Sequence, residues 1–230
     1  SSAFVILFLF WSTTLFLKKI SKKNNFPNDT NILLSSSIGA LAFTFSDSFW
    51  FNAVETEVYA LAMLFLSATF WCGLRWEKDF DNKRGDKWLL LICFLIGLSF
   101  GVHFMAILTI PAIGMIYFFK KYEKITIKNF VLANIISVSI LLFIFKLLLP
   151  STLSLFGQLE VFFVNSIGLP FNSGTIIAAF LIVFFFYKSL SYTRLKGMVQ
   201  ANTLILCILF IFIGFSSWLM LPIRSNANTV

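Results

Sequence analysis

Residues 88–119 read WLLLICFLIGLSFGVHFMAILTIPAIGMIYFF, an apolar run that contains no Lys, Arg, Asp or Glu. A helix that crosses a lipid bilayer needs about 20 apolar residues, so this run is too long for one span. The chain must therefore turn inside it, and Gly101, Val102 and His103 mark the place. The run predicts two membrane segments, 88–103 and 104–119, in a membrane protein.

The composition agrees with this class. Hydrophobic residues make up 59% of the 230 residues and charged residues only 12%, whereas soluble domains are about half apolar and about a quarter charged. Phe alone occupies 31 positions, which suits a surface that faces lipid. We therefore predict an all-α, polytopic bundle of transmembrane helices, to which the domain sizes of soluble proteins do not apply.

Eight apolar segments are predicted to form this bundle. They lie at 3–17, 31–45, 58–74, 88–103, 104–119, 130–149, 174–190 and 201–221. The chain opens on SSAFVILFLFW without an initiator Met and stops at RSNANTV. We expect residues 1–230 to be one transmembrane domain that is a fragment of a longer protein, cut at both ends.

Basic residues alternate between the loops. The loops after the first, third, fifth and seventh segments hold every Lys and Arg except Lys146 and Arg224. Because the cytoplasmic loops of membrane proteins are enriched in Lys and Arg, these four loops are predicted to be cytoplasmic. The net charge of +8 is thus a sign of topology, and we expect no binding to nucleic acid.

The other, extracytoplasmic side receives three carboxylates in the stretch FSDSFWFNAVETEVYAL, residues 45–61. Asp47, Glu55 and Glu57 have no loop cations beside them. Residues two apart on a helix point about 200° apart, so Glu55 and Glu57 cannot both face one site if they are helical. Glu57 begins the apolar run EVYALAMLFL and is the stronger candidate, because ionisable groups at membrane depth are costly and often functional. A carboxylate that is merely solvated at the membrane surface is the alternative.

His103 and Arg224 are further candidates for substrate binding on this side. His103 is the only histidine and suits proton transfer or phosphate binding, although a lone histidine at a turn often bonds only a backbone carbonyl. Arg224 suits a bidentate contact to an anionic head group, or a snorkelling anchor at a helix end. Asn226 in the same tail and Glu160 in the 150–173 loop complete the set. Lys146 is interpreted as a snorkelling residue, with binding of lipid phosphate as the alternative.

The loop that contains Glu160 has an unusual composition. Its stretch LSLFGQLEVFFVNSIGLPFNSG, residues 153–174, mixes apolar residues with three glycines and a proline. This pattern predicts a short interfacial helix that lies on the membrane and is followed by a turn. A re-entrant connector is the alternative.

The cysteines indicate no metal site. Cys72, Cys93 and Cys207 lie inside apolar runs without CxxC spacing. We interpret them as small buried hydrophobic residues.

Several motifs together resemble one family. They are FWFNAVETEVYALAMLF at 49–65, FWCGLRWE at 70–77, GLSFGVHFMAILTIPAIGMIYFF at 97–119, FFVNSIGLPFNSG at 162–174 and LPIRSNAN at 221–228. In this order they resemble a bacterial family of polytopic proteins, long catalogued as a domain of unknown function. The same family includes the eukaryotic plexin-type transmembrane O-mannosyltransferase.

The resemblance implies a membrane glycosyltransferase of the GT-C superfamily. It implies an inverting transfer of a sugar, expected to be mannose, from a polyprenyl-phosphate carrier to a Ser or Thr of an extracytoplasmic protein or to another acceptor. The implied location is a bacterial inner membrane, with membrane lipid, the lipid-linked donor and the acceptor as partners. No cofactor is expected, and a divalent metal is compatible with the superfamily although no ligand set points to one.

The resemblance also implies roles for single residues. The family's catalytic carboxylate is expected in a first extracytoplasmic loop outside residues 1–230, so no catalytic base is named here. Glu57 matches the family's Glu-Val-Tyr/Phe motif and, with His103, would position the sugar or the acceptor. Arg224 would stabilise the departing phosphate.

Two other functions stay open. A transporter or flippase for a lipid-linked sugar should show inverted repeats and helices broken near mid-membrane. The sequence has no visible internal repeat, and its acidic residues gather at one surface. A non-catalytic membrane subunit of a larger assembly is the second alternative.

Overall fold

The computed structural model describes residues 1–23, 28–55, 58–82 and 85–216, and within these ranges it contains helices and no strand. The fold class predicted from the sequence, an all-α helical membrane protein, is confirmed. The helices are α1 (Ser2–Lys23), α2 (Asp29–Thr44), α3 (Asp47–Val54), α4 (Tyr59–Lys78), α5 (Asp86–Ser99), the 3-10 helix η1 (Phe104–Leu108), α6 (Thr109–Lys121), α7 (Ile127–Leu142), the π-helix η2 (Phe143–Leu148), α8 (Leu149–Val161), the π-helix η3 (Phe162–Ser166), α9 (Ser173–Leu195) and α10 (Val199–Ser216).

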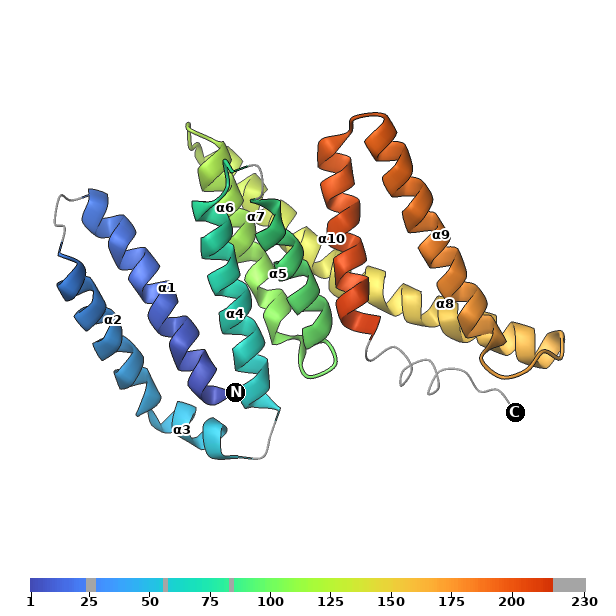
Figure 1. Ribbon diagram of the computed structural model, residues 1–230, viewed down its shortest axis with the longest axis horizontal. Coiled ribbons are helices and arrows are strands. Elements are labelled where there is room, and N and C mark those ends of the chain that lie inside the picture. Colours follow the sequence, from blue (N-terminus) through green and yellow to red (C-terminus); the bar gives the residue numbers. More distant parts are fainter. Residues whose placement is uncertain (24–27, 56–57, 83–84, 217–230) are drawn as a thin grey trace.

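The chain has two ends of different charge. α1 ends and α2 begins at the top of Figure 1, and the turns from α4 to α5, α6 to α7 and α9 to α10 lie at the same end. We call it the basic end, because the lysine-rich loops belong to it. The opposite, distal end carries α3, the turn from α5 to η1 and the turn from α8 to α9 (Figure 1). The predicted division of the loops into two groups is therefore confirmed.

Fewer helices than predicted are long enough to cross a bilayer. Five of the described helices qualify by length and composition, and the α2–α3 pair, bent by 64°, makes a sixth if it counts as one span. The described parts of all eight predicted segments fall mainly on helices, and residues 217–221 of the last segment lie outside the described ranges. α5, however, has only 14 residues, or about 21 Å at 1.5 Å per residue. The last turn of α4 carries Arg75, Glu77 and Lys78, which shortens its apolar part.

One rod runs along a whole side of the molecule. α7, η2, α8 and η3 form a continuous helix of 40 residues, Ile127–Ser166, which at 1.5 Å per residue is about 60 Å long, or twice the hydrocarbon core. α8 falls where a short interfacial helix was predicted, yet it continues α7 without a break. Pro150 is tolerated because it lies in the first turn of α8, directly after the wider π turn. α8 crosses the lower part of Figure 1 at a steep angle to α9 and α10. That α8 lies on the membrane surface stays a prediction.

The closest helix contact joins α5 to α10. A Cβ atom at Gly97 would lie 2.1 Å from the carbonyl oxygen of Ile211, and one at Gly214 would lie 2.3 Å from the carbonyl oxygen of Phe94. Glycines let helix backbones approach in this way, because they carry no side chain. The three cysteines lie in or against the apolar core that this contact helps to form, as predicted.

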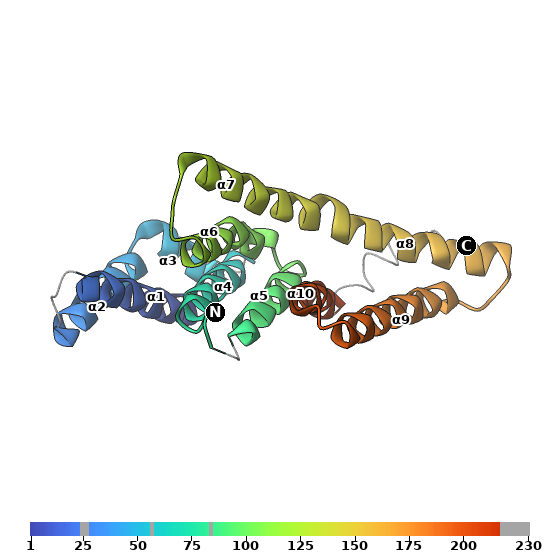
Figure 2. The same cartoon turned by 90° about the horizontal axis from the view of Figure 1, so that it is seen from above.

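The contacts between neighbouring helices close a ring. α5 packs on α10, α10 on α9, α9 on α8, and the rod returns through η2 and α7 to α6, which packs on α4. α4 packs on α5 and completes the circuit. Seen from above in Figure 2, the rod forms one side of the ring, and α5, α10 and α9 form the other.

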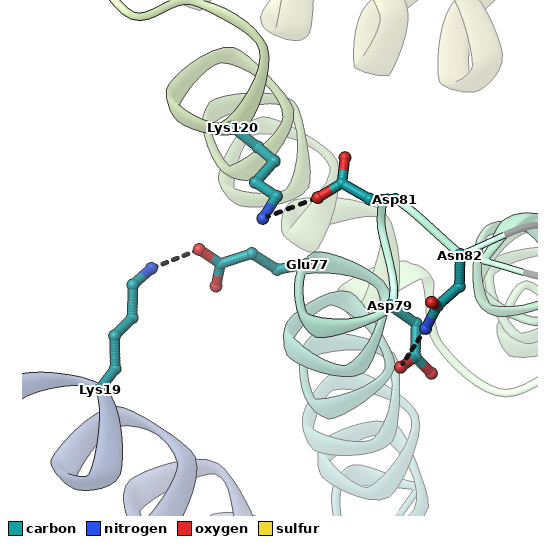
Figure 3. Close-up of polar contacts among 6 residues, drawn as sticks. All are labelled: Lys19, Glu77, Asp79, Asp81, Asn82 and Lys120. Carbon is teal, nitrogen blue, oxygen red and sulfur yellow. Dashed lines mark hydrogen bonds and ion pairs between the residues drawn. The ribbon is translucent and has the colours of Figure 1, made fainter. Parts of the chain in front are cut away.

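Ion pairs join three helices at the basic end (Figure 3). Glu77 of α4 pairs with Lys19 of α1, and Asp81 in the following turn pairs with Lys120 of α6 at 3.4 Å. The side chains of Lys19 and Asp81 are largely exposed, and those of Glu77 and Lys120 are partly buried. Exposed pairs contribute about 1 kcal/mol or less, so they fix the relative position of the helix ends more than they stabilise the fold.

Asp79 organises the turn from α4 to α5. Its carboxylate accepts hydrogen bonds from the indole N–H of Trp88 at 2.8 Å and from the amide of Asn82 at 3.3 Å. The Trp88 bond is the main reason why the pKa of Asp79 is lowered from its usual value. Arg75 lies over the Trp88 ring, 5.2 Å from its centre, and adds a favourable charge.

The glycine contact between α5 and α10 predicts a specific sensitivity. Gly97→Ala should lower the free energy of unfolding by about 1–3 kcal/mol, because the new methyl group forces the two backbones apart. Gly39→Ala is the matched control, since a Cβ at Gly39 meets no atom within 4 Å. Thermal unfolding in detergent measures both, and equal melting temperatures for the two variants would contradict the predicted contact.

Candidate functional site

The side chain of His103 lies in the turn at the distal end that joins α5 to η1. The residue is the N-cap of η1 in an extended conformation, and its backbone N–H donates to the carbonyl of Ser99 at 2.8 Å. Its Nδ1 atom is buried and has no hydrogen-bond partner within the described residues. A buried polar atom without a partner is unusual and costs free energy, so a ligand or a water that bonds it would be favourable.

A row of side chains runs from α4 past His103 to the rod. The ring centres of Tyr59 and His103 are 6.0 Å apart, and the imidazole stacks on Phe104 at 4.7 Å. Phe104 contacts Phe145 at 5.3 Å, and the ammonium of Lys146 lies 5.3 Å from the centre of the Phe145 ring. The row therefore connects a histidine to a lysine through aromatic contacts that come from three separate helices.

Two of the predicted carboxylates lie on α3. Asp47 is its first residue and Glu55 is its C-cap, and both side chains are exposed. Within the described ranges neither carboxylate has an ion pair or a side-chain hydrogen bond, and no contact joins either to His103. Their role in substrate binding stays a prediction.

Three predicted site residues, Glu57, Arg224 and Asn226, lie outside the described residues. The structure nevertheless places Tyr59, two residues after Glu57, beside His103.

Glu160 caps a helix. Its side chain is 5% exposed, and one carboxylate oxygen accepts the backbone N–H of Asn172 at 2.5 Å. The other accepts the backbone N–H and the hydroxyl of Thr175 at 2.7 and 3.0 Å. The first N–H groups of a helix have no partner inside it, and the carboxylate supplies one at the start of α9. Predicted as a substrate-binding candidate, Glu160 has a structural role in these contacts.

The same turn needs Gly174. A Cβ there would lie 2.4 Å from the carbonyl oxygen of Leu159 and 2.5 Å from the backbone of Glu160. Asn172 precedes it with φ of 71°, a left-handed conformation that Asn tolerates better than most residues. The turn thus holds α8 and α9 in close contact through a glycine and a buried carboxylate.

A cavity of about 710 Å³ lies inside the ring of helices, between α5, α6, α7 and α10. Most of the lining side chains are apolar, and among the described residues that form it none is charged. Its wall on the rod runs from Asn129 to Leu148, about 28 Å at 1.5 Å per residue. This groove has the length and the lining that suit a hydrocarbon chain.

The sequence did not reveal how this site is assembled. Phe104 and Phe145 occur in apolar runs that contain many other Phe residues, so no local signal distinguishes them. Lys146 was interpreted from the sequence as a snorkelling residue, with binding of lipid phosphate as the alternative, and its contact with the Phe145 ring was not predicted. In the described part of the chain no group of three His, Cys, Asp or Glu side chains could hold a metal ion, and a divalent metal stays an untested expectation.

Comparison with known proteins adds one match. The family model described as the protein O-mannosyl-transferase TMEM260 N-terminal domain matches residues 1–126, more than half of the 230-residue chain. No curated protein and no solved structure matches. The matched region runs from α1 through α6 and includes Asp47, Glu55, Glu57 and His103.

The capping contacts of Glu160 predict its effect on stability. Glu160→Gln should lower the free energy of unfolding by about 1–3 kcal/mol, because the amide NH₂ would face the N–H groups that the carboxylate now accepts. Glu123→Gln, at an exposed carboxylate near the basic end, is the control and should change little. Thermal unfolding in detergent measures both. If Glu160→Gln were as stable as the control, the capping role would be wrong.

Proposed function

Since the chain belongs to the family of the protein O-mannosyl-transferase TMEM260 N-terminal domain, we propose that it is a membrane glycosyltransferase. The reaction transfers mannose from a polyprenyl-phosphate carrier to the hydroxyl of a Ser or Thr in an acceptor protein. The match over residues 1–126 is the observation that carries this proposal. The arrangement of charge and the groove support it.

The charge distribution predicts the side of the membrane on which the reaction takes place. If the basic end faces the cytoplasm, as the positive-inside rule predicts, the distal end with Asp47, Glu55 and His103 faces outward. A protein acceptor would then meet the carboxylates from the extracytoplasmic side, in a bacterial inner membrane. The carrier would stay in the bilayer and present its sugar at the same surface.

The groove supports a lipid-linked donor. Its uncharged walls suit the chain of the carrier, and it lies inside the helix ring of the fold. The same walls disfavour a transporter, because a sugar phosphate that crossed the membrane there would find no charged partner among the described lining residues.

The proposed chemistry is an inverting displacement. A carboxylate takes the proton of the acceptor hydroxyl while the oxygen attacks the anomeric carbon, and the carrier phosphate leaves with the bonding electrons. A cation close to that phosphate stabilises the charge that develops on it. Glu57 and Arg224, predicted from the sequence, remain candidates to bind the sugar or acceptor and the phosphate.

Transfer can be measured directly. The full-length protein in nanodiscs is supplied with radiolabelled polyprenyl-phosphate mannose and a mixture of extracytoplasmic proteins. Label should appear on protein and be released by mild alkali, which eliminates sugars from Ser and Thr. Glu57→Gln should lower kcat/KM about 10- to 100-fold, the effect of losing a hydrogen bond between a charged group and the sugar or acceptor, whereas Glu123→Gln at the basic end should leave it unchanged.

The negative result is equally informative. Absence of label with mannose and with other polyprenyl-linked sugars would reject the enzymatic proposal in favour of a non-catalytic subunit. Movement of the labelled lipid between leaflets without transfer would favour a flippase.

A further inference from the structure

We infer that Arg75 and Lys87 bind the phosphate of an anionic phospholipid from the leaflet at the basic end of the molecule. The site lies where α4 ends and α5 begins, beside the indole ring of Trp88. The turn that carries His103 is at the opposite, distal end (Figure 1). The ligand is therefore distinct from the sugar donor and the acceptor, and the inference does not rest on the proposed reaction.

Arg75 lies in the angle between two indole rings. Its guanidinium carbon is 5.2 Å from the centre of the Trp88 ring and 5.8 Å from that of the Trp71 ring, and the two rings meet at 87°. Trp71 and Arg75 belong to the motif FWCGLRWE, which has no part in the proposed reaction. Arginine stacks on aromatic faces in this way, so the rings hold the guanidinium in place without neutralising its charge.

The N–H donors of Arg75 lack protein acceptors. A guanidinium carries more N–H donors than any other side chain, and within the described ranges it forms no hydrogen bond and no ion pair. Its Nε atom is buried and has no partner there. Polar groups that are withdrawn from water are normally paired, so an acceptor from outside the chain would be favourable at this position.

Positive charge around Trp88 exceeds negative charge. The ammonium of Lys87 lies 5.3 Å from the centre of the same ring, and this exposed side chain forms no ion pair within the described ranges. Both Arg75 and Lys87 act electrostatically on Asp79. The oxygens of that carboxylate already accept hydrogen bonds from Trp88 and Asn82. Two cations thus share one carboxylate, which leaves one positive charge for an anionic ligand.

The neighbouring carboxylates have partners of their own. Glu77 and Asp81 pair with lysines of α1 and α6. Asp86 accepts a hydrogen bond from the hydroxyl of Thr203 in α10 at 3.3 Å. In the described part of this end, these carboxylates therefore leave the guanidinium of Arg75 without an ion pair.

The surroundings favour a lipid over a soluble anion. One helical turn farther from the basic end, the Trp71 ring contacts Trp11 and Phe8 of α1, with ring centres 5.3 and 5.5 Å away. Trp side chains are enriched at the level of the head groups, and basic pockets between membrane helices on the cytoplasmic side bind anionic head groups. A lipid whose phosphate contacts Arg75 would have its acyl chains next to these apolar rings.

A purely structural stack is the competing explanation. Arg75 would then only connect α4 to α5 through the two rings. Its replacement would lower the melting temperature by the same amount with and without anionic lipid, and lipid affinity would not depend on it.

Binding of phosphatidylglycerol to the delipidated full-length protein in uncharged detergent, measured by native mass spectrometry, distinguishes the two. Arg75→Gln should raise the Kd of the first bound lipid about tenfold, the effect of losing a hydrogen bond to a charged group. Lys87→Gln should raise it about fivefold, as expected for one basic residue near an anionic lipid. Arg194→Gln, at an exposed arginine in the last turn of α9, is the matched control and should bind as the wild type does.

A second readout is thermal unfolding. A ligand that binds only the folded state stabilises it, so phosphatidylglycerol should raise the melting temperature of the wild type and of Arg194→Gln more than that of Arg75→Gln. An equal increase in all three proteins would contradict the site.

Other outcomes would also overturn the inference. Equal Kd values for wild type and Arg75→Gln would leave the stack with a structural role alone. Equal affinity for phosphatidylcholine, which has no net charge, would show that the cations do not select the lipid. Displacement of the lipid by inorganic phosphate at constant ionic strength would identify a site for a soluble anion. If Arg75→Gln does not fold, the exposed Lys87 decides, and an unchanged Kd for Lys87→Gln would reject the site.

Discussion

The contact between α5 and α10 is the constraint on which the rest of this structure depends. α10 touches the first half of the chain through α5, and Gly97 and Gly214 let the two backbones meet. Without this contact the α9–α10 hairpin would be held only by α8. With it, the rod and the hairpin close a ring with α4, α5 and α6, and the groove lies inside that ring.

The two ends of the molecule are stabilised by different interactions. At the basic end, exposed ion pairs and the bonded carboxylate of Asp79 connect helices that are already anchored by apolar packing. At the distal end, the buried carboxylate of Glu160 replaces missing hydrogen bonds at a helix start. Within the described ranges, the Nδ1 of His103 in the α5–η1 turn is a buried polar atom without a hydrogen-bond partner. Asp47 and Glu55 on α3 are instead exposed to water.

Much of the fold could be predicted from the sequence because its signals are local. Apolar runs gave the helices, and the alternating lysines gave the division into two ends. The structure differs from the prediction in the lengths of two elements. α5 ends at Ser99, because the chain already turns at residues 100–103. α8 continues α7, because the π turn η2 directly precedes Pro150.

By itself, therefore, the sequence determined the membrane class, the division of the loops into two groups and the family, since these follow from composition and from motifs read along the chain. It also singled out His103 and Glu160 as unusual polar residues. Only the tertiary structure decided what they do. Glu160 caps α9 because Gly174 brings the helix start against it. His103 lies beside Tyr59 of α4, and its neighbour Phe104 contacts Phe145 of the rod. Contacts of this kind arise when helices close into a ring, and no single segment specifies them.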